Sequence, residues 1–456
     1  MVSCIEPSSH DPSVAYVAAT GYKNDDNTPF LYKTSNYGKD WQLIVNGIPG
    51  QDFTRVIRED PSKPGLLYAG TETGVYISLD DGKKWESLKF NLPVVPIYDL
   101  KIKDGDLIAA THGRSFWILD DISALSELSN KSLTECSLFN PRKYTRVLEQ
   151  IGSRIEAEGE GKHYMSIVLG EPATYTELAN VGENKYLNAG TNPPDGAIIY
   201  YYLNGDISDE IKLDITDSND KLVKSFSSNT CNELSAKKGI NRLVWDLRDE
   251  EVKELDDAVG GSSPFGAQNT GILLPPGNYS LTMASKDFKS SAVLQVVKDP
   301  RSDASADDLN EQYRLQDQIR GKYSETYENV EKLRSVRKQL KDWLEKGRGL
   351  KDENKLTKKI SQIETALADI ENQLVPFKSA GKQPRGIPVG LYFKLKELMG
   401  IVASGDYGPT APSYDLLEDL NTRLEEEFNA LDKIYNKQVK EVVDLIEQIG
   451  IPTIKI

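Results

Sequence analysis

Three arginines in the first quarter of the chain, with several carboxylates near them in the sequence, are side chains that could bind or hydrolyse a substrate. The arginines are Arg55, Arg58 and Arg114, and a guanidinium group binds a carboxylate through paired hydrogen bonds. The carboxylates nearby are Glu59, Asp60, Asp99, Asp120 and Asp121. Two carboxyl groups at a suitable separation can hydrolyse a glycosidic bond. The spacing of these residues along the chain does not show whether their side chains converge in one site. The candidate catalytic residues are Arg55, Arg58, Arg114, Asp120 and Asp121.

The densest cluster of polar and aromatic side chains is the run THGRSFWILDD at 111–121. His112, Arg114 and Trp117 could line a ligand face there. The alternative is an internal role, in which Arg114 pairs with a carboxylate of the chain and Trp117 closes the last sheet.

Composition excludes several classes of function. A chain of 456 residues predicts two to four domains, and a net charge of -15 argues against nucleic acid or anionic membranes as partners. No apolar segment is long enough to predict membrane insertion. Cys4, Cys136 and Cys231 are odd in number and far apart, so neither a disulfide framework nor a metal site is expected. Phosphate-loop, HExxH and GxSxG motifs are absent from the sequence, and we expect no cofactor.

An internal repeat organises the first 125 residues. LYKTSNYGKDW at 31–41 aligns without gaps to VYISLDDGKKW at 75–85, a period of 44 residues that is typical of a four-stranded propeller blade. FWILDDISAL at 116–125 is a degenerate third copy. A short apolar strand ending in Thr precedes each copy. Residues 1–125 are therefore predicted to be blades of an incomplete β-propeller.

The repeated motif, Ser/Thr-x-Asp-x-Gly-x-x-Trp, has a physical logic. The Asp or Asn accepts backbone N–H bonds within a turn, the hydroxyl joins the same network, the Gly permits positive φ, and the Trp packs over the turn. The residues at these positions are Thr34, Asn36, Gly38 and Trp41 in one copy, and Ser78, Asp80, Gly82 and Trp85 in the other.

Both copies resemble the Asp-box, or bacterial neuraminidase repeat (BNR), of sialidase-like and sortilin-like propellers. GTETGVYISLDDGKKW followed by ATHGRSFWILDD is similar to the final blades of large bacterial Asp-box proteins, labelled BNR-repeat glycosyl hydrolases or sortilin N-terminal-like proteins. The resemblance implies export to the periplasm or cell exterior. Only about three blades fit into residues 10–125, whereas closed propellers have four to eight. We therefore expect the chain to be the C-terminal portion of a longer protein. The alternative is that the missing blades come from another chain, and self-association is open as well.

The same resemblance raises an enzyme hypothesis. Sialidases hold the substrate carboxylate with three arginines and use a tyrosine nucleophile supported by a glutamate, with an aspartate as acid and base. In that family the Asp boxes lie at the blade periphery and are structural, so their presence does not imply catalysis.

The middle of the chain predicts a second β domain. No period dominates residues 126–195, which we interpret as a connector. Residues 196–300 contain short strands with Pro/Gly turns, typical of a β-sandwich, and PPGNYSLT and NRLVWDLR resemble an Ig-like module. Asp217, Asn219 and Asp220 are interpreted as a polar hairpin turn, because the glycine and distal glutamate of a calcium loop are missing.

Residues 301–456 are predicted to form a helical hairpin and bundle. Apolar residues recur at alternating steps of three and four, with coiled-coil spacing. The three stripes are Ile319 to Leu344, Leu356 to Leu374 and Leu417 to Ile446. We expect these stripes to be core rather than a partner-binding groove, and Ser413 to cap the last helix.

Three functions remain open from these patterns. The favoured prediction is a non-catalytic binding or scaffold module for a protein, peptide or glycan. A sialidase-type glycoside hydrolase and a structural component of the cell envelope are the alternatives. A hydrolase predicts converging arginines beside a Tyr–Glu pair, whereas a binding module predicts an aromatic or uncharged face.

Overall fold

The protein is a mixed α/β chain. The computed structural model describes residues 1–128, 135–148, 163–168, 171–176, 193–194, 196–255, 271–350, 352–375 and 390–449. These residues fall into two compact units. Unit 1 comprises residues 1–144, 178–247 and 277–297, and unit 2 comprises residues 145–177, 248–276 and 298–456. None of the helices in the described ranges has the length and apolar character needed to cross a bilayer.

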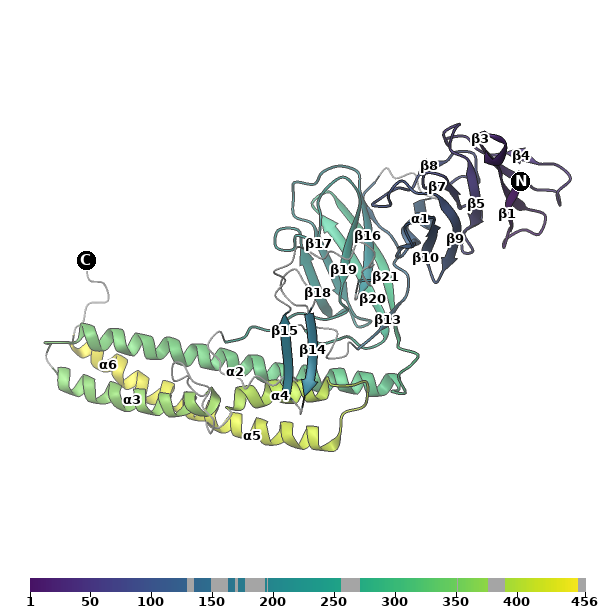
Figure 1. Ribbon diagram of the computed structural model, residues 1–456. Coiled ribbons are helices and arrows are strands. Elements are labelled where there is room, and N and C mark those ends of the chain that lie inside the picture. Colours follow the sequence, from purple (N-terminus) through teal and green to yellow (C-terminus); the bar gives the residue numbers. More distant parts are fainter. Residues whose placement is uncertain are drawn as a thin grey trace. The chain divides into compact units, whose positions relative to one another are not determined.

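Three antiparallel sheets, which we call blades 1 to 3, begin unit 1 (Figure 1). In each blade every strand pairs with the next one along the chain, as in a propeller blade. Blade 1 contains β1 (Val2–Pro7), β2 (Ala15–Gly21), β3 (Asp26–Thr34) and β4 (Gln42–Leu43), with a short 3-10 helix at Tyr22–Asn24. Blade 2 contains β5 (Thr54–Glu59), β6 (Leu67–Thr71), β7 (Val75–Ser78) and β8 (Glu86–Ser87). Blade 3 contains β9 (Ile97–Lys103), β10 (Asp106–Thr111) and β11 (Phe116–Leu119), and α1 (Ser123–Leu128) follows it.

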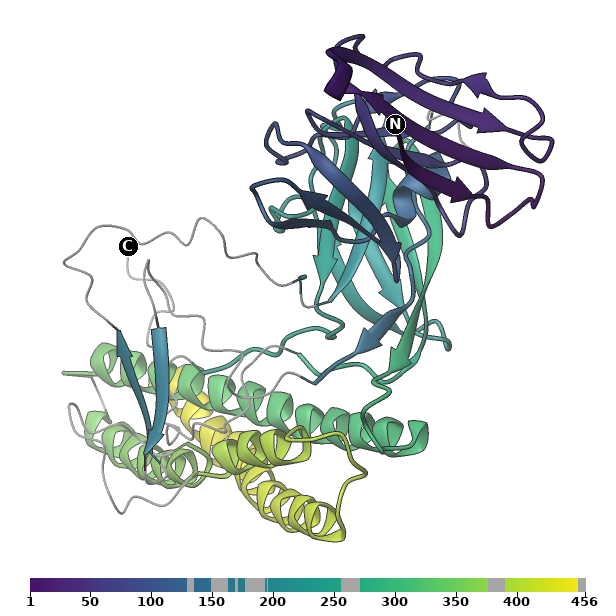
Figure 2. The same ribbon diagram turned by 45° about the vertical axis from the view of Figure 1, so that its right-hand side comes forward.

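Apolar side chains fill the spaces between consecutive blades. Tyr16 and Leu31 of blade 1 pack with Ile57 and Trp85 of blade 2. Blade 2 packs on blade 3 through a second cluster, which includes Tyr68. Strands β2 and β5 lie side by side, as do β5 and β9 (Figure 2). Blades 1 and 2 therefore each bury one face of their sheet against the next blade.

Two further sheets complete unit 1 and face each other. The smaller has the order β12 (Ser137–Leu138), β16 (Ala197–Leu203), β19 (Gly239–Trp245). The larger has the order β13 (Tyr144–Arg146), β21 (Phe288–Lys298), β20 (Gly277–Ser285), β17 (Lys212–Thr216), β18 (Leu222–Ser227). Trp245 and Tyr279, one from each sheet, meet edge to face with ring centroids 6.1 Å apart. The Asp217 turn joins β17 to β18, and its carboxylate accepts the Asn219 and Lys221 backbone N–H groups.

The expected connector at 126–195 contributes more structure than its pattern indicated. Strands β12 and β13 lie within it and pair with β16 and β21, which are much later in the sequence. Two-residue and three-residue strands are too short to show an alternation, so only their pairing partners identify them. Strands β14 (His163–Val168) and β15 (Glu171–Thr176) form an antiparallel pair in unit 2.

Helices make up most of unit 2 and share one core. They are α2 (Ala306–Lys346), α3 (Glu353–Leu374), α4 (Leu391–Val402), α5 (Ala411–Lys433) and α6 (Lys440–Ile449), with a π-helical turn at Ile434–Val439. Nearly all residues of the three predicted stripes are buried in this core. The prediction that Ser413 caps α5 was wrong, because Thr410 is the N-cap residue and Ser413 lies in the first turn of the helix. Helix α4 belonged to none of the predicted stripes.

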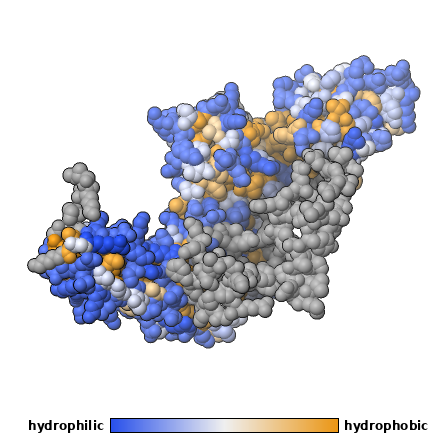
Figure 3. Space-filling model, turned by 60° about the vertical axis from the view of Figure 1, so that its left-hand side comes forward, coloured by the Kyte–Doolittle hydropathy of each residue, from blue (hydrophilic) through white to orange (hydrophobic). Residues whose placement is uncertain are grey.

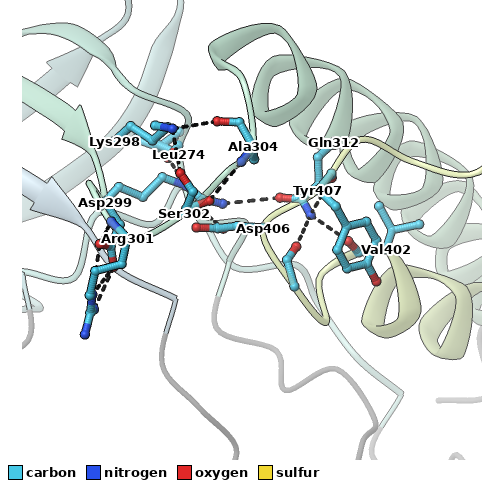
Figure 4. Close-up of polar contacts among 12 residues, drawn as sticks. Leu274, Lys298, Asp299, Arg301, Ser302, Ala304, Gln312, Val402, Asp406 and Tyr407 are labelled. Atoms are coloured by element: carbon cyan, nitrogen blue, oxygen red, sulfur yellow. Dashed lines mark hydrogen bonds and ion pairs between the residues drawn. The ribbon is translucent and has the colours of Figure 1, made fainter.

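A polar joint fastens the start of α2 to the chain around it (Figure 4). The buried Arg146 side chain donates to Leu274 O at 3.0 Å, contacts Gln312 Oε1 at 3.2 Å and forms an ion pair with Asp406. Gln312 Nε2 in turn donates to Val402 O at 2.9 Å. A buried guanidinium is tolerated only when it is paired and hydrogen-bonded, as Arg146 is. We therefore interpret Arg146 as a structural residue of unit 2 and not as part of a binding site.

Candidate functional site

The first strands of the three blades share a local irregularity that sets the candidate site. In each strand one residue is skipped by the pairing register, which makes a β-bulge. The skipped residues are Ser3 in β1, Arg55 in β5 and Tyr98 in β9. Bulges re-aim side chains and are frequent beside functional sites.

Arg55 is the centre of an aromatic cluster at this end of the blades. Its guanidinium carbon lies 4.2 Å from the Tyr98 ring centroid, 4.9 Å from that of Phe53 and 5.3 Å from that of Tyr22. The Tyr22 and Phe53 rings stack at 5.0 Å, and Tyr98 stacks on His112 at 5.0 Å. These contacts bring together side chains from all three blades. We call this group, with Glu72, the Arg55 surface.

Glu72 holds the Arg55 guanidinium in place. Arg55 Nε and Nη2 both donate to Glu72 Oε2, at 2.9 and 2.6 Å. The turn that carries Glu72 is fixed by the buried Asp52, whose carboxylate accepts the Thr73 backbone N–H and the hydroxyls of Thr71 and Thr73. Arg55 therefore has its own carboxylate, while Tyr98 stays 48% exposed.

Arg58 lies on the same strand but has other partners. Its Nη2 donates to Asp99 at 2.6 Å, and its Nη1 donates to Glu6 at 3.0 Å and to the Cys4 sulfur at 2.9 Å. Burial disfavours the charged form, yet these neighbours together raise the pKa of Arg58. Arg58 thus joins the first strands of blades 1 and 3 across blade 2.

The remaining residues of the 111–121 run divide between the two ends of β11. At the end near the Arg55 surface, Arg114 is exposed and the Trp117 indole donates to Arg114 O at 3.0 Å, which braces the turn. Asp120 and Asp121 follow the opposite end of the strand. Asp121 is buried and accepts the Tyr144 hydroxyl at 2.5 Å. Burial, reinforced by the Asp106 carboxylate, raises the pKa of Asp120.

A Tyr–Glu pair exists, but it is remote from the Arg55 surface. The Tyr16 hydroxyl donates to Asp81 at 2.9 Å and contacts Glu59 at 3.2 Å, and the Tyr16 side chain is 1% exposed between blades 1 and 2. Burial, with the two carboxylates, raises the pKa of Tyr16. Glu59 ends the strand on which Arg55 lies at the start, so about 13 Å of extended chain separates them. The candidate arginines and carboxylates are therefore not gathered into one site.

The two copies of the repeated motif make matching hydrogen bonds. Thr34 Oγ1 accepts the Gly38 N–H at 3.0 Å, and Ser78 Oγ accepts the Gly82 N–H at 2.9 Å. Asn36 and Asp80 each accept the backbone N–H four residues on, at 3.0 and 2.9 Å.

The two tryptophans of the motif differ in burial. Trp85 is 2% exposed and its indole donates to Ile44 O of blade 1 at 2.7 Å, whereas Trp41 is 44% exposed. The eight motif residues thus lie where the third strand of each blade leads to the fourth. In blade 2 this is the end of the sheet opposite Arg55, because Ser78 and Glu59 both pair with Leu67.

Sequence reasoning missed four residues of the Arg55 surface, namely Tyr22, Phe53, Glu72 and Tyr98. A bulge leaves no periodic signal, and the cluster is assembled from three blades. Within the described ranges, no group of three or more His, Cys, Asp or Glu side chains could hold a metal ion.

Comparisons with known proteins supply no family. No family model matches the chain, and no curated protein matches. Among solved structures, the chain is similar to YCF48 bound to D1 peptide (13% identity, 49% of this chain and 53% of that chain, TM-score 0.19). It is also similar to a GH74 enzyme of Niastella koreensis (10% identity, 64% and 46%, TM-score 0.22). A third is the extracellular domain of a putative hybrid two-component system from B. thetaiotaomicron (12% identity, 65% and 36%, TM-score 0.20). This chain spans about half or less of each protein, and scores this low carry no argument about its function.

Proposed function

We propose that this chain is a non-catalytic binding or scaffold module built on Asp-box propeller blades, with a protein, peptide or glycan as its ligand. The Arg55 surface is the proposed binding face. One observation carries this proposal: Arg55 and Arg58 are each held by carboxylates of the chain itself, while the Tyr98 ring is half exposed beside them. An arginine fixed by its own carboxylate positions aromatic rings for stacking, and it is not free to clamp a ligand carboxylate.

The Asp-box and sortilin-like assignment is part of the same proposal. It is supported by the matching hydrogen bonds of the two motif turns. In this proposal the turns stiffen the periphery of the blades, and the ligand binds where the bulged first strands begin. The two facing sheets of unit 1, proposed as an Ig-like module, and the helices of unit 2 act as spacer and docking elements.

The sialidase-type alternative meets a specific obstacle. It requires a tyrosine nucleophile with a glutamate close to three free arginines. The Tyr16–Glu59 pair is buried between two blades, at the opposite end of β5 from Arg55. A buried tyrosine whose pKa is raised is a poor nucleophile near neutral pH. The geometry therefore favours the binding module.

The proposal is tested on the intact chain with two arrays, one of sialylated and neutral glycans and one of random-sequence peptides. We expect ligands on at least one array. Tyr98→Ala should weaken that binding about tenfold, which corresponds to about 1.4 kcal/mol from one lost stacking contact. Tyr37→Ala is the matched control, because Tyr37 is 73% exposed on a blade 1 turn outside the Arg55 surface, and it should bind like the wild type.

Two results would contradict the proposal. One is the absence of binding on both arrays. The other is hydrolysis of a fluorogenic sialoside by the wild-type chain, abolished by Arg55→Ala, which would establish the glycoside hydrolase instead.

A further inference from the structure

Blade 3 meets the two facing sheets of unit 1 through a cluster of charged and phenolic side chains. The proposed binding face uses neither Asp120 nor Asp121, although both were candidate catalytic residues, and both belong to this cluster. The members are Asp106, Asp120 and Asp121 of blade 3, with Arg142, Tyr144, Tyr200 and Arg242 of the facing sheets and of the segment that joins β12 to β13. We call this group the Asp120 junction.

Arg142 connects two carboxylates of blade 3. Its Nη1 donates to Asp106 Oδ1 at 2.7 Å and to Asp104 O at 3.1 Å, and its Nε lies 3.9 Å from Asp121 Oδ2. The Tyr144 hydroxyl donates to the same Asp121 oxygen at 2.5 Å. The Asp121 backbone N–H donates to Asp106 Oδ1 at 2.8 Å, so the start of β10 and the end of β11 are held together. Asp106 and Asp121 therefore each accept a hydrogen bond from beyond blade 3.

Asp120 is the third carboxylate of the junction, and it is held differently. It is partly buried, and its carboxylate accepts no hydrogen bond from the described residues. Its backbone carbonyl lies 3.5 Å from the Tyr200 hydroxyl of β16. The charged groups that face it are the carboxylates of Asp106 and Asp121 and the guanidinium groups of Arg142 and Arg242.

The charges of the junction do not balance when all its carboxylates are ionised. Three carboxylates and two guanidinium groups leave one negative charge in excess. Most of the visible molecular surface is hydrophilic, and on such a surface water and salt screen an excess of this size (Figure 3). At the junction the Asp121 side chain is fully buried, so the screening is weaker. A proton on Asp120 removes the excess charge without breaking any hydrogen bond of Arg142 or Tyr144.

We propose that the Asp120 junction is a pH-responsive clamp, which holds blade 3 more firmly on the facing sheets when Asp120 carries a proton. Burial, reinforced by the Asp106 carboxylate, raises the pKa of Asp120 in the closed junction. The closed junction therefore binds this proton more tightly than an open one does. The free energy of opening is greatest below the raised pKa and falls as the pH rises through it. Mild acid thus fixes the blades against the facing sheets, and neutral pH loosens them.

Native-state hydrogen exchange of the intact chain at pH 5 and pH 7 measures this opening, once the rates are corrected for the pH dependence of intrinsic exchange. The reporting amides are those of residues 104–106 and 119–123. In the wild type their protection factors should be at least about threefold higher at pH 5 than at pH 7. Asp120→Asn keeps the shape of the side chain and removes the titrating group. Its junction should be equally protected at both pH values, and better protected than the wild type at pH 7.

Asp104→Asn is the matched control. It removes a carboxylate from the turn just before Asp106, but the Asp104 side chain is exposed, so this variant should keep the wild-type response to pH. Equal protection of the wild type at pH 5 and pH 7 would overturn the proposal. A response that persists in Asp120→Asn would overturn it as well, because another group would then carry the proton. Loss of the response in both variants would assign it to the overall charge of blade 3 and not to Asp120.

Discussion

Glu371 on α3 offers the most quantitative test of the helical unit. Its side chain is 1% exposed, and it accepts the Arg334 Nε at 2.8 Å and pairs with Arg337 through its other oxygen. Glu371→Gln keeps the shape of the side chain and removes its charge. Two guanidinium groups on α2, 25% and 20% exposed, then face a neutral amide. The two guanidinium groups would lose the buried counter-charge that they share.

The expected cost follows from the burial. Removing one partner of a buried ion pair costs about 3–5 kcal/mol. We take the lower end, about 3 kcal/mol, because Arg337 keeps a bond to Glu364 at 3.2 Å and both arginines reach some water. Glu331→Gln is the control, since Glu331 is 51% exposed and lies 3.9 Å from Arg334. Exposed pairs of this kind contribute only about 0–1 kcal/mol.

Native-state hydrogen exchange of the α2 and α3 amides measures this cost locally, which suits a chain of several parts that need not unfold in one step. A loss of about 3 kcal/mol accelerates exchange about 150-fold in Glu371→Gln. The control should change by less than about fivefold. Equal acceleration in both variants would refute the claim that burial decides the strength of this ion pair.

Two further predictions concern the pH dependence of stability at Asp299 and the effect of adding a Cβ atom at Gly47. Hydrogen bonds from Arg301 lower the pKa of Asp299 to about 2, so this carboxylate stabilises the fold above about pH 4 and ceases to do so as the pH falls through 2. The free energy of unfolding, measured by urea titration, should therefore fall less in Asp299→Asn than in the wild type between pH 4 and pH 2. An identical fall in both proteins would contradict this. Gly47 has φ +103°, and a Cβ atom there would lie 2.2 Å from Trp85 O. Gly47→Ala should therefore lower the melting temperature. Gly50→Ala is the control and should not lower it, because a Cβ atom at Gly50 meets no other atom within 4 Å. Equal melting temperatures for the two glycine variants would contradict the second prediction.

Local patterns were read correctly where a residue's burial repeats with a fixed period. The helical stripes of residues 319–446 are core, because an amphipathic helix must bury its apolar face. The 44-residue repeat marked two turns with the same hydrogen bonds, because those bonds form within a few residues of chain. The cap at Thr410 and the helix at 391–402 were missed, since neither belongs to a strong stripe.

The repeats, the helical core and the residue types available for catalysis or binding could therefore be read from the sequence alone. Which of those residues lie close together depends on the fold. Arg55, Tyr98 and His112 come together from two blades through bulges that leave no trace in periodicity, while Asp120 and Asp121 lie at the far end of β11. These side chains meet because strands from distant parts of the sequence pack together. The periodicity of apolar residues indicates which face of a strand or helix is buried, but it does not indicate which element covers that face.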